Sequence, residues 1–247
     1  MPRFIVLALE APLMAFGDEI VDNLGRVRGF PGASNLTGLL ANALGWTRGM
    51  RRQHQRLQDR LTFAVRLDRP GEEIEDFQTV QLGAGDRGWT TRGVFEGRAG
   101  GAQTYASPHI RYRSMIADAA LTVALTLDPP GEEPTLDDLA AALAAPARPV
   151  FLGRKPCLPC RPLLLREAVE APDALTAAAE APAWIEDGAS HPDGPILVGA
   201  AREDLPAAFE RRFVADTRNW MSGVHGGGRM LALGRAGHLG REAEGPR

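Results

Sequence analysis

The chain has 247 residues, of which 44% are hydrophobic, and a formal net charge of −3; these values are typical of a soluble globular protein with one large core or two small ones. No apolar run approaches the roughly 18 residues of a membrane span, and the first one, 4–9, is too short for a secretory signal and ends at Glu10. We therefore expect a cytoplasmic protein without a membrane partner.

The chain begins with a strand signal followed by a helix signal. Residues 3–9 (RFIVLAL) form a short apolar run that predicts a buried strand. After a polar loop, Ser34 is a good N-cap for a helix whose apolar residues between 36 and 44 keep helical spacing. Gly45 is suited to ending this helix.

Further strand signals follow, and then a second helix. Residues 61–68 alternate and predict a strand, 74–82 predict a third, and 120–127 (ALTVALTL) predict the clearest strand of the chain. Thr135 predicts an N-cap, because Asp138 stands three residues later, as in a capping box. The glycine-rich stretch 83–105 is too long for an ordinary connection and predicts a protruding functional loop or a disordered one.

After residue 163 the pattern weakens. Residues 183–188 and 195–201 predict two strands, and 211–223 are expected to pack near the core. From His225 onward the glycine-rich sequence predicts a flexible tail.

This order of elements predicts an α+β fold. It resembles a split βαβ, ferredoxin-like (RRM-like) core with a long thumb-like β-hairpin insertion and a smaller, irregular C-terminal β region. The expected boundaries are a domain at 1–166 with its insertion at about 83–112, a small β region at 167–224 and a tail at 225–247.

The two cysteines of the chain, Cys157 and Cys160, form a C-x-P-C motif. A thioredoxin-type motif follows a strand and opens a helix, and that context is missing here. A zinc site requires about four ligands, and no second cysteine pair exists. We therefore expect no metal, no cofactor and no thiol-oxidoreductase activity.

Charge is distributed unevenly along the chain. Segment 26–60 holds seven arginines and one acid, 86–113 holds five arginines and two acids, and 148–166 holds five basic residues and no acid. Segment 167–210 holds ten acids and one arginine. The asymmetry indicates a polyanionic partner on one face, although a solvated surface of mixed sign explains it equally well.

Two short motifs have the chemistry of anion sites. The first is the helix start at Ser34, where free backbone N–H groups follow Arg26 and Arg28. The second is a loop in which Arg154 and Lys155 come directly after Gly153. Each motif alone is better explained as an ordinary capped helix or glycine turn. Together with the three basic segments they favour binding to an RNA backbone.

One set of residues is compatible with metal-independent RNA cleavage. His109 with Tyr105, Tyr112 or Lys155 is the only general acid–base set that the sequence offers. Nothing in the spacing requires these residues to meet.

Five segments in this order and spacing resemble one known family: MPRFIVLALEAPLMAFG, GFPGASNLTGLLANALGW, DFQTVQLGAGDRGWTTRG, ADAALTVALTL and FLGRKPCLPCRPLL. The family is that of the CasD (Cas-five) subunits of type I-E CRISPR Cascade, within the repeat-associated RNA-binding (RAMP) superfamily. The resemblance covers residues 2–166 well and 205–228 loosely. Cys157 belongs to the family's motif, and Cys160 does not.

The resemblance implies a non-catalytic subunit that binds the 5′ handle of the CRISPR RNA and caps the filament of backbone subunits in antiviral defence. Its partners would be the backbone subunit and the large subunit, and target DNA only indirectly through the complex. In the related type I-C systems a Cas-five protein is itself the endoribonuclease, so that alternative stays open. The implied RNA-binding residues are Arg26, Arg28, Ser34, Arg87, Trp89, Arg92, Arg98, Arg111, Arg113, Gly153, Arg154 and Lys155.

Overall fold

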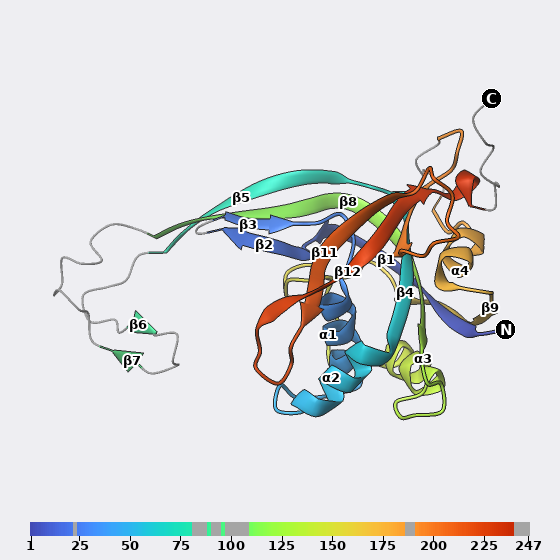
Figure 1. The fold of residues 1–247 in the computed structure, drawn as a ribbon. Helices are drawn as coiled ribbons and strands as arrows, with labels where there is room; N and C mark the ends of the chain where they lie inside the picture. Colours follow the sequence, from blue (N-terminus) through green and yellow to red (C-terminus); the bar gives the residue numbers. More distant parts are fainter. Residues whose placement is uncertain (22–23, 81–87, 90–94, 97–108, 186–190, 240–247) are drawn as a thin grey trace.

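A computed structural model describes residues 1–21, 24–80, 88–89, 95–96, 109–185 and 191–239. Within these residues the chain forms four α-helices and one large mixed sheet of ten strands, with a separate two-stranded pairing (Figure 1). This mixed content agrees with the predicted α+β class. No helix in the described part of the chain is long and apolar enough to cross a membrane.

Four antiparallel strands form the centre of the sheet, in the order β4-β8-β1-β9. They are β1 (Arg3–Met14), β4 (Leu61–Arg69), β8 (His109–Leu127) and β9 (Leu164–Glu170). The first three confirm the strands predicted from their apolar runs, and β8 is much longer than its predicted part. The strand β9 lies where the sequence signal is weak.

Helices cover both faces of this sheet. The helices α1 (Ala33–Ala43), α2 (Arg51–Arg60) and α3 (Leu136–Ala144) contribute leucines to a core with alternate residues of β1, including Ile5 and Leu7. The helix α4 (Ala174–Glu180) packs on the other face, against Phe4 and Val6. Because both faces of β1 are covered, the strand is apolar throughout instead of alternating.

Of the two predicted helix caps, the one at Thr135 is confirmed and the one at Ser34 is wrong. Thr135 does cap α3: its hydroxyl accepts from the Asp138 N–H, and the Asp138 carboxylate accepts from the Thr135 N–H. The cap of α1 is Gly32 and not Ser34, which lies inside the first turn. At α1 the side chain of Asn35 accepts from the Gly32 N–H.

The helix α2 is not predicted by the sequence, because its buried face is largely polar. Leu57 lies on that face together with His54, Gln58 and Arg60. His54 is only 6% exposed, although it stands in a run rich in arginine and glutamine. Its ring stacks on Trp220 at 4.7 Å, and its Nδ1 lies 2.7 Å from the carbonyl oxygen of Met50.

A β-hairpin arm extends away from the body of the molecule (Figure 1). The strand β5 (Glu72–Val80) pairs with the first half of β8, from Glu72 opposite Ala117 to Val80 opposite His109. The hairpin β2 (Gly17–Val21) and β3 (Leu24–Val27) lies alongside, with β3 parallel to β8.

This arm begins before the insertion predicted at about 83–112, because strand pairing already starts at Glu72. Of residues 81–108, the structure describes only the backbone of two short strands, β6 (Gly88–Trp89) and β7 (Phe95–Glu96).

The C-terminal strands continue the same sheet. The strand β10 (Ile196–Ala200) pairs with β4, and β12 (His225–Arg235) lies between β10 and the edge strand β11 (Glu210–Arg218). Of the two predicted C-terminal strands, 195–201 is confirmed, and no strand forms at 183–185.

The expectation of a flexible tail from His225 is wrong up to residue 239, where β12 and a short 3-10 helix (Ala236–His238) form. Leu231 and Ala232 of β12 are fully buried. The glycines before them carry no side chains, so this part of the strand lacks the apolar–polar alternation that predicts a strand. Residues 240–247 lie outside the described part of the chain.

Candidate nucleic-acid interface

The loop predicted to contact RNA packs tightly against the end of β1. Gly153 has φ of +98°, and a Cβ on it would lie 1.9 Å from the carbonyl oxygen of Ala15. Leu152 accepts a hydrogen bond from the Ala15 N–H at 3.0 Å and donates one to Cys157 at 2.7 Å. Only glycine satisfies both the left-handed backbone and the close approach, so the loop has one fixed position.

Arg154 joins this loop to the base of the arm. Its guanidinium donates to the carbonyl oxygen of Ser114 on β8 at 3.0 Å and to that of Gly25 on β3 at 3.4 Å. Burial lowers the pKa of Arg154, and the nearby charge of Arg113 lowers it further. Both causes disfavour the charged form, whereas the carboxylate of Asp76 favours it. An anionic ligand would stabilise the cation in the same way as Asp76 does.

Arg113 lies beside Arg154 with an unused donor. Its Nε is buried and has no hydrogen-bond partner among the described residues, although Asp76 lies opposite it on β5. Arg26 on β3 and Lys155 on the glycine loop are both exposed. We call Arg26, Arg113, Arg154 and Lys155 the arm-base cluster.

The remaining predicted cations lie farther along the chain of the arm. Arg111 is exposed, two residues from Arg113 and on the same face of β8. Trp89 lies in β6, of which only the backbone is described. Three predicted contacts lie outside the described residues: Arg87, Arg92 and Arg98.

The predicted anion site at the start of α1 already holds an anion that belongs to the protein. The carboxylate of Asp216, whose side chain is 0% exposed, accepts from the Ala33 N–H at 3.1 Å. Arg229 donates to the same carboxylate from Nε and Nη2, at 3.0 and 2.9 Å. This contact joins residues far apart in the chain, so no local sequence pattern predicts it.

Neighbouring Arg28 is buried and is not accessible to a ligand. It donates to the carboxylate of Asp18 at 2.5 Å and to the carbonyl oxygen of Ala215 at 3.3 Å. Of the two arginines that precede this helix, only Arg26 stays exposed, and it lies on β3 beside the glycine loop rather than at the helix start.

The two cysteines lie in different environments. Cys157 is buried and Cys160 is exposed, and both are free thiols. Burial raises the pKa of Cys157, which makes its thiol a poor nucleophile. The N–H of Cys157 donates to the carbonyl oxygen of Arg154, so this cysteine helps to close the glycine loop.

The candidate acid–base set is only partly described. The backbone of His109 begins β8. The structure does not describe the side chain of His109 or any part of Tyr105. The ring of Tyr112 packs against Phe77, with centroids 5.5 Å apart. Lys155 is exposed on the glycine loop.

Known proteins resemble this chain over most of its length. The family model described as "CRISPR-associated protein (Cas_Cas5)" matches residues 4–230. The CRISPR system Cascade subunit CasD of Escherichia coli (strain K12) is 31% identical over 166 residues, which are 67% of this chain and 71% of that protein.

Two solved structures have a similar fold. A chain of a structure titled "CRISPR RNA-guided surveillance complex" has a TM-score of 0.68 at 25% identity, covering 94% of this chain and 89% of that one. A chain titled "Crystal structure of Cas protein" has a TM-score of 0.58 at 23% identity, covering 99% and 100%. The sequence resemblance is thereby confirmed: the chain belongs to the Cas5 family of CRISPR-associated proteins, which includes CasD subunits.

Proposed function

We propose that this protein is a non-catalytic, RNA-binding subunit of a type I-E Cascade surveillance complex in the cytoplasm. It holds the 5′ handle of the CRISPR RNA and caps the filament of backbone subunits. The observation that carries the proposal is the arm-base cluster, where the partly desolvated Arg154 stands beside Arg113, whose Nε has no partner in the described structure. A phosphate there offsets the mutual repulsion and supplies the missing acceptor.

The cluster offers two kinds of RNA contact. Lys155 and Arg26 are exposed beside the half-buried Arg113 and Arg154, and they bind successive phosphates of one strand. Farther along the arm, the exposed ring of Phe77 packs on Tyr112 and offers an aromatic surface for a splayed base. Phosphate contacts set the position of the strand, and the unstacked bases carry its sequence.

The arm also has the character of a protein-binding element. Four of its apolar side chains are 37–57% exposed: Ile74, Phe77, Val80 and Ile110. A projecting hairpin with such side chains is suited to burial against another subunit. We propose the backbone subunit as the partner of the arm and the large subunit as a second partner, with target DNA reached through the complex.

We propose that the central strands form the ferredoxin-like core of this family. In chain order the elements run β1, α1 with α2, β4, β8, α3 and β9, and in the sheet the strands run β9-β1-β8-β4. A strand order in which the first and third strands are central supports a split βαβ arrangement.

The handle-binding role is tested with the double variant Arg113→Ala/Lys155→Ala and fluorescent RNA that carries the 5′ handle. Loss of two phosphate contacts lowers the slope of log affinity against log salt by about 1.4, at about 0.7 per phosphate on single strands. The matched control is Arg166→Ala/Arg212→Ala, which removes two exposed arginines elsewhere. Equal slopes for the two double variants contradict the proposal.

The absence of catalysis needs a separate experiment. Purified protein is incubated with the CRISPR repeat RNA without metal, and we expect no cleavage. Specific cleavage that His109→Ala abolishes would instead establish the endoribonuclease function of the type I-C relatives.

A further inference from the structure

A second basic surface lies away from the arm. Arg48, Arg51 and Arg52 surround the start of α2 and are all exposed; we call them the α2 basic patch. Arg51 donates to the carbonyl oxygen of Met221 at 3.1 Å. Arg48 and Arg52 have no hydrogen bond or ion pair with any described residue. Figure 1 shows α2 on the helical side of the molecule, apart from the arm of β5, β8, β2 and β3.

The position of these charges is unfavourable for the helix itself. The first turn of α2 contains two arginines and no acidic residue, and its N-cap makes no side-chain hydrogen bond. Positive charges near the positive end of a helix destabilise it. The fold thus does not explain the patch, whereas an anionic ligand would offset its charge.

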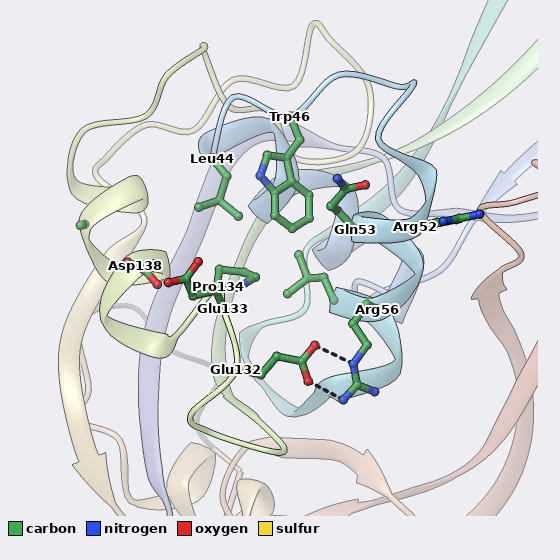
Figure 2. Close-up of a pocket in the computed structure, with 11 residues that line it drawn as sticks. Leu44, Trp46, Arg52, Gln53, Arg56, Glu132, Glu133, Pro134 and Asp138 are labelled. Atoms are coloured by element: carbon green, nitrogen blue, oxygen red, sulfur yellow. Dashed lines mark hydrogen bonds and ion pairs between the residues drawn. The ribbon is translucent and has the colours of Figure 1, made fainter.

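A cavity of about 710 Å³ opens beside the patch (Figure 2). Its volume is in the range of small-ligand sites. Arg52 and Gln53 contribute polar groups to its wall, and the apolar part of its lining is Leu44, Trp46, Leu57, Pro134 and Ala141. Figure 2 shows the Trp46 indole among these side chains, with Arg52 directed outward from α2.

The aromatic wall of the cavity is held in place from two sides. The ring of Trp46 meets His54 edge to face, with centroids 5.6 Å apart. Arg148 donates to the carbonyl oxygens of Trp46 and Gly45 and so fixes the loop that carries the ring. A fixed aromatic ring next to free cations is the combination that single-stranded nucleic acids use for stacking and phosphate contact.

The carboxylates of the cavity do not oppose this use. Glu132 forms a two-point ion pair with Arg56, at 2.5 and 2.7 Å. Asp138 is engaged in the cap of α3 through Thr135. The third carboxylate, Glu133, is an acceptor that suits the amino group of a nucleobase. The phosphates of a bound strand would therefore lie on the arginines outside the cavity, away from the carboxylates.

We propose that this surface is a second nucleic-acid site, which binds one unstacked base of a single strand against Trp46 and its flanking phosphates on Arg48, Arg51 and Arg52. The site is independent of the handle site at the arm-base cluster. A partner with a purely apolar surface would fill the cavity but would leave the charges of the three arginines beside it without a counter-charge. The chemistry is common to RNA and DNA, so the test includes both.

The test measures binding of the full-length chain to 12-nucleotide fluorescent oligo(dT) and oligo(U), neither of which contains a handle sequence. For Arg48→Ala/Arg52→Ala we expect weaker binding and a salt slope that is smaller by about 1.4. Both side chains are exposed, so folding is unaffected. The matched control Arg166→Ala/Arg212→Ala leaves the slope unchanged.

The cavity is tested with Trp46→Ala, for which the loss of one base stack weakens binding by roughly 5- to 150-fold. Ultraviolet crosslinking of the wild-type chain, read by mass spectrometry, is expected to attach the oligonucleotide to the peptide that contains Trp46, which keeps the test valid if this variant does not fold.

Three results would overturn the inference: no binding at 50 mM salt, equal slopes for the two double variants, or crosslinks only at the arm. Arg113→Ala/Lys155→Ala is measured in parallel with handle RNA, so failure of the handle site and failure of this one are read separately. Tighter binding of oligo(dT) would identify DNA as the ligand of this site. Tighter binding of oligo(U) would identify RNA.

Discussion

At the scale of single residues, Gly153 shows how sequence chemistry fixes the loop that carries the arm-base cluster. Its φ is +98°, and a Cβ would lie 1.9 Å from the Ala15 carbonyl oxygen. We expect Gly153→Ala to lower the free energy of unfolding by about 3 kcal/mol, from backbone strain and the displacement of Ala15. Denaturant titration measures this change.

A matched control for that loop variant is Gly29→Ala, since an added Cβ at Gly29 meets nothing within 4 Å. It should change stability by less than about 0.5 kcal/mol. If the two variants unfold alike, Gly153 is not in the close contact with β1 that the structure shows.

Asp216 is a second residue whose role depends entirely on distant partners. Its carboxylate is fully buried between Arg229 and the first turn of α1. Removing it in Asp216→Ala leaves the Arg229 charge and the Ala33 N–H without their partner, which should cost about 3 kcal/mol. Glu210→Ala, which breaks only the exposed pair with Arg212, should cost less than about 1 kcal/mol, and thermal unfolding of both variants tests the difference.

At the scale of elements, the two helix starts give a direct comparison. Thr135 caps α3 with its hydroxyl, whereas Ser34 lies inside the first turn of α1 and does not cap it. We expect Thr135→Ala to cost about 1 kcal/mol and Ser34→Ala to cost less than about 0.5 kcal/mol. Equal losses in chemical denaturation would contradict this assignment of the caps.

The cap of α3 also has a defined pH dependence. Hydrogen bonds from the N–H and hydroxyl of Thr135 hold the pKa of Asp138 below its usual value. The folded-state pKa is lower than the unfolded one, so the stabilisation is present above the unfolded pKa and is lost as pH falls through the folded pKa. The stability difference between wild type and Asp138→Asn should therefore shrink in strongly acidic solution.

Elements with a strong local signal could be predicted from the sequence, and elements that depend on distant contacts could not. The apolar runs of β1 and β8 and the capping box at Thr135 are local, and each was confirmed. The helix α2 was missed because His54, Gln58 and Arg60 are buried through contacts with other segments. The strand β12 was missed because three glycines, 226–228, precede its buried residues.

The candidate site was predictable to a similar extent. The cations of the glycine loop were found because Gly153, Arg154 and Lys155 are adjacent in the chain. The sequence does not predict that Nε of Arg113 lacks a hydrogen-bond partner, because this results from the pairing of β8 with β3 and β5. The Trp46 cavity combines segments that lie about 90 residues apart, 44–57 and 132–141, and no local pattern connects them.

At the scale of the whole molecule, one sheet joins the predicted domain at 1–166 to the C-terminal strands. The expected boundary at residue 166 does not divide two sheets, because β10 pairs with β4. The hairpin of β11 and β12 is also tied to α1 through Asp216 and Arg229. These contacts make the C-terminal strands part of the main core rather than an appendage.

Truncation tests this view of the whole chain. Removing 225–247, the segment expected to be a flexible tail, deletes β12 and thereby separates β11 from β10. It also exposes the core around Leu231 and removes Arg229, which leaves Asp216 as a buried, unpaired carboxylate. Several such losses together exceed the roughly 5–15 kcal/mol that stabilises a folded protein, so the truncated chain should not fold. Removing only 240–247 keeps every described element, and this control should unfold at the temperature of the full-length chain in circular dichroism. A cooperative transition in the longer deletion at an unchanged temperature would show that the core does not require β12.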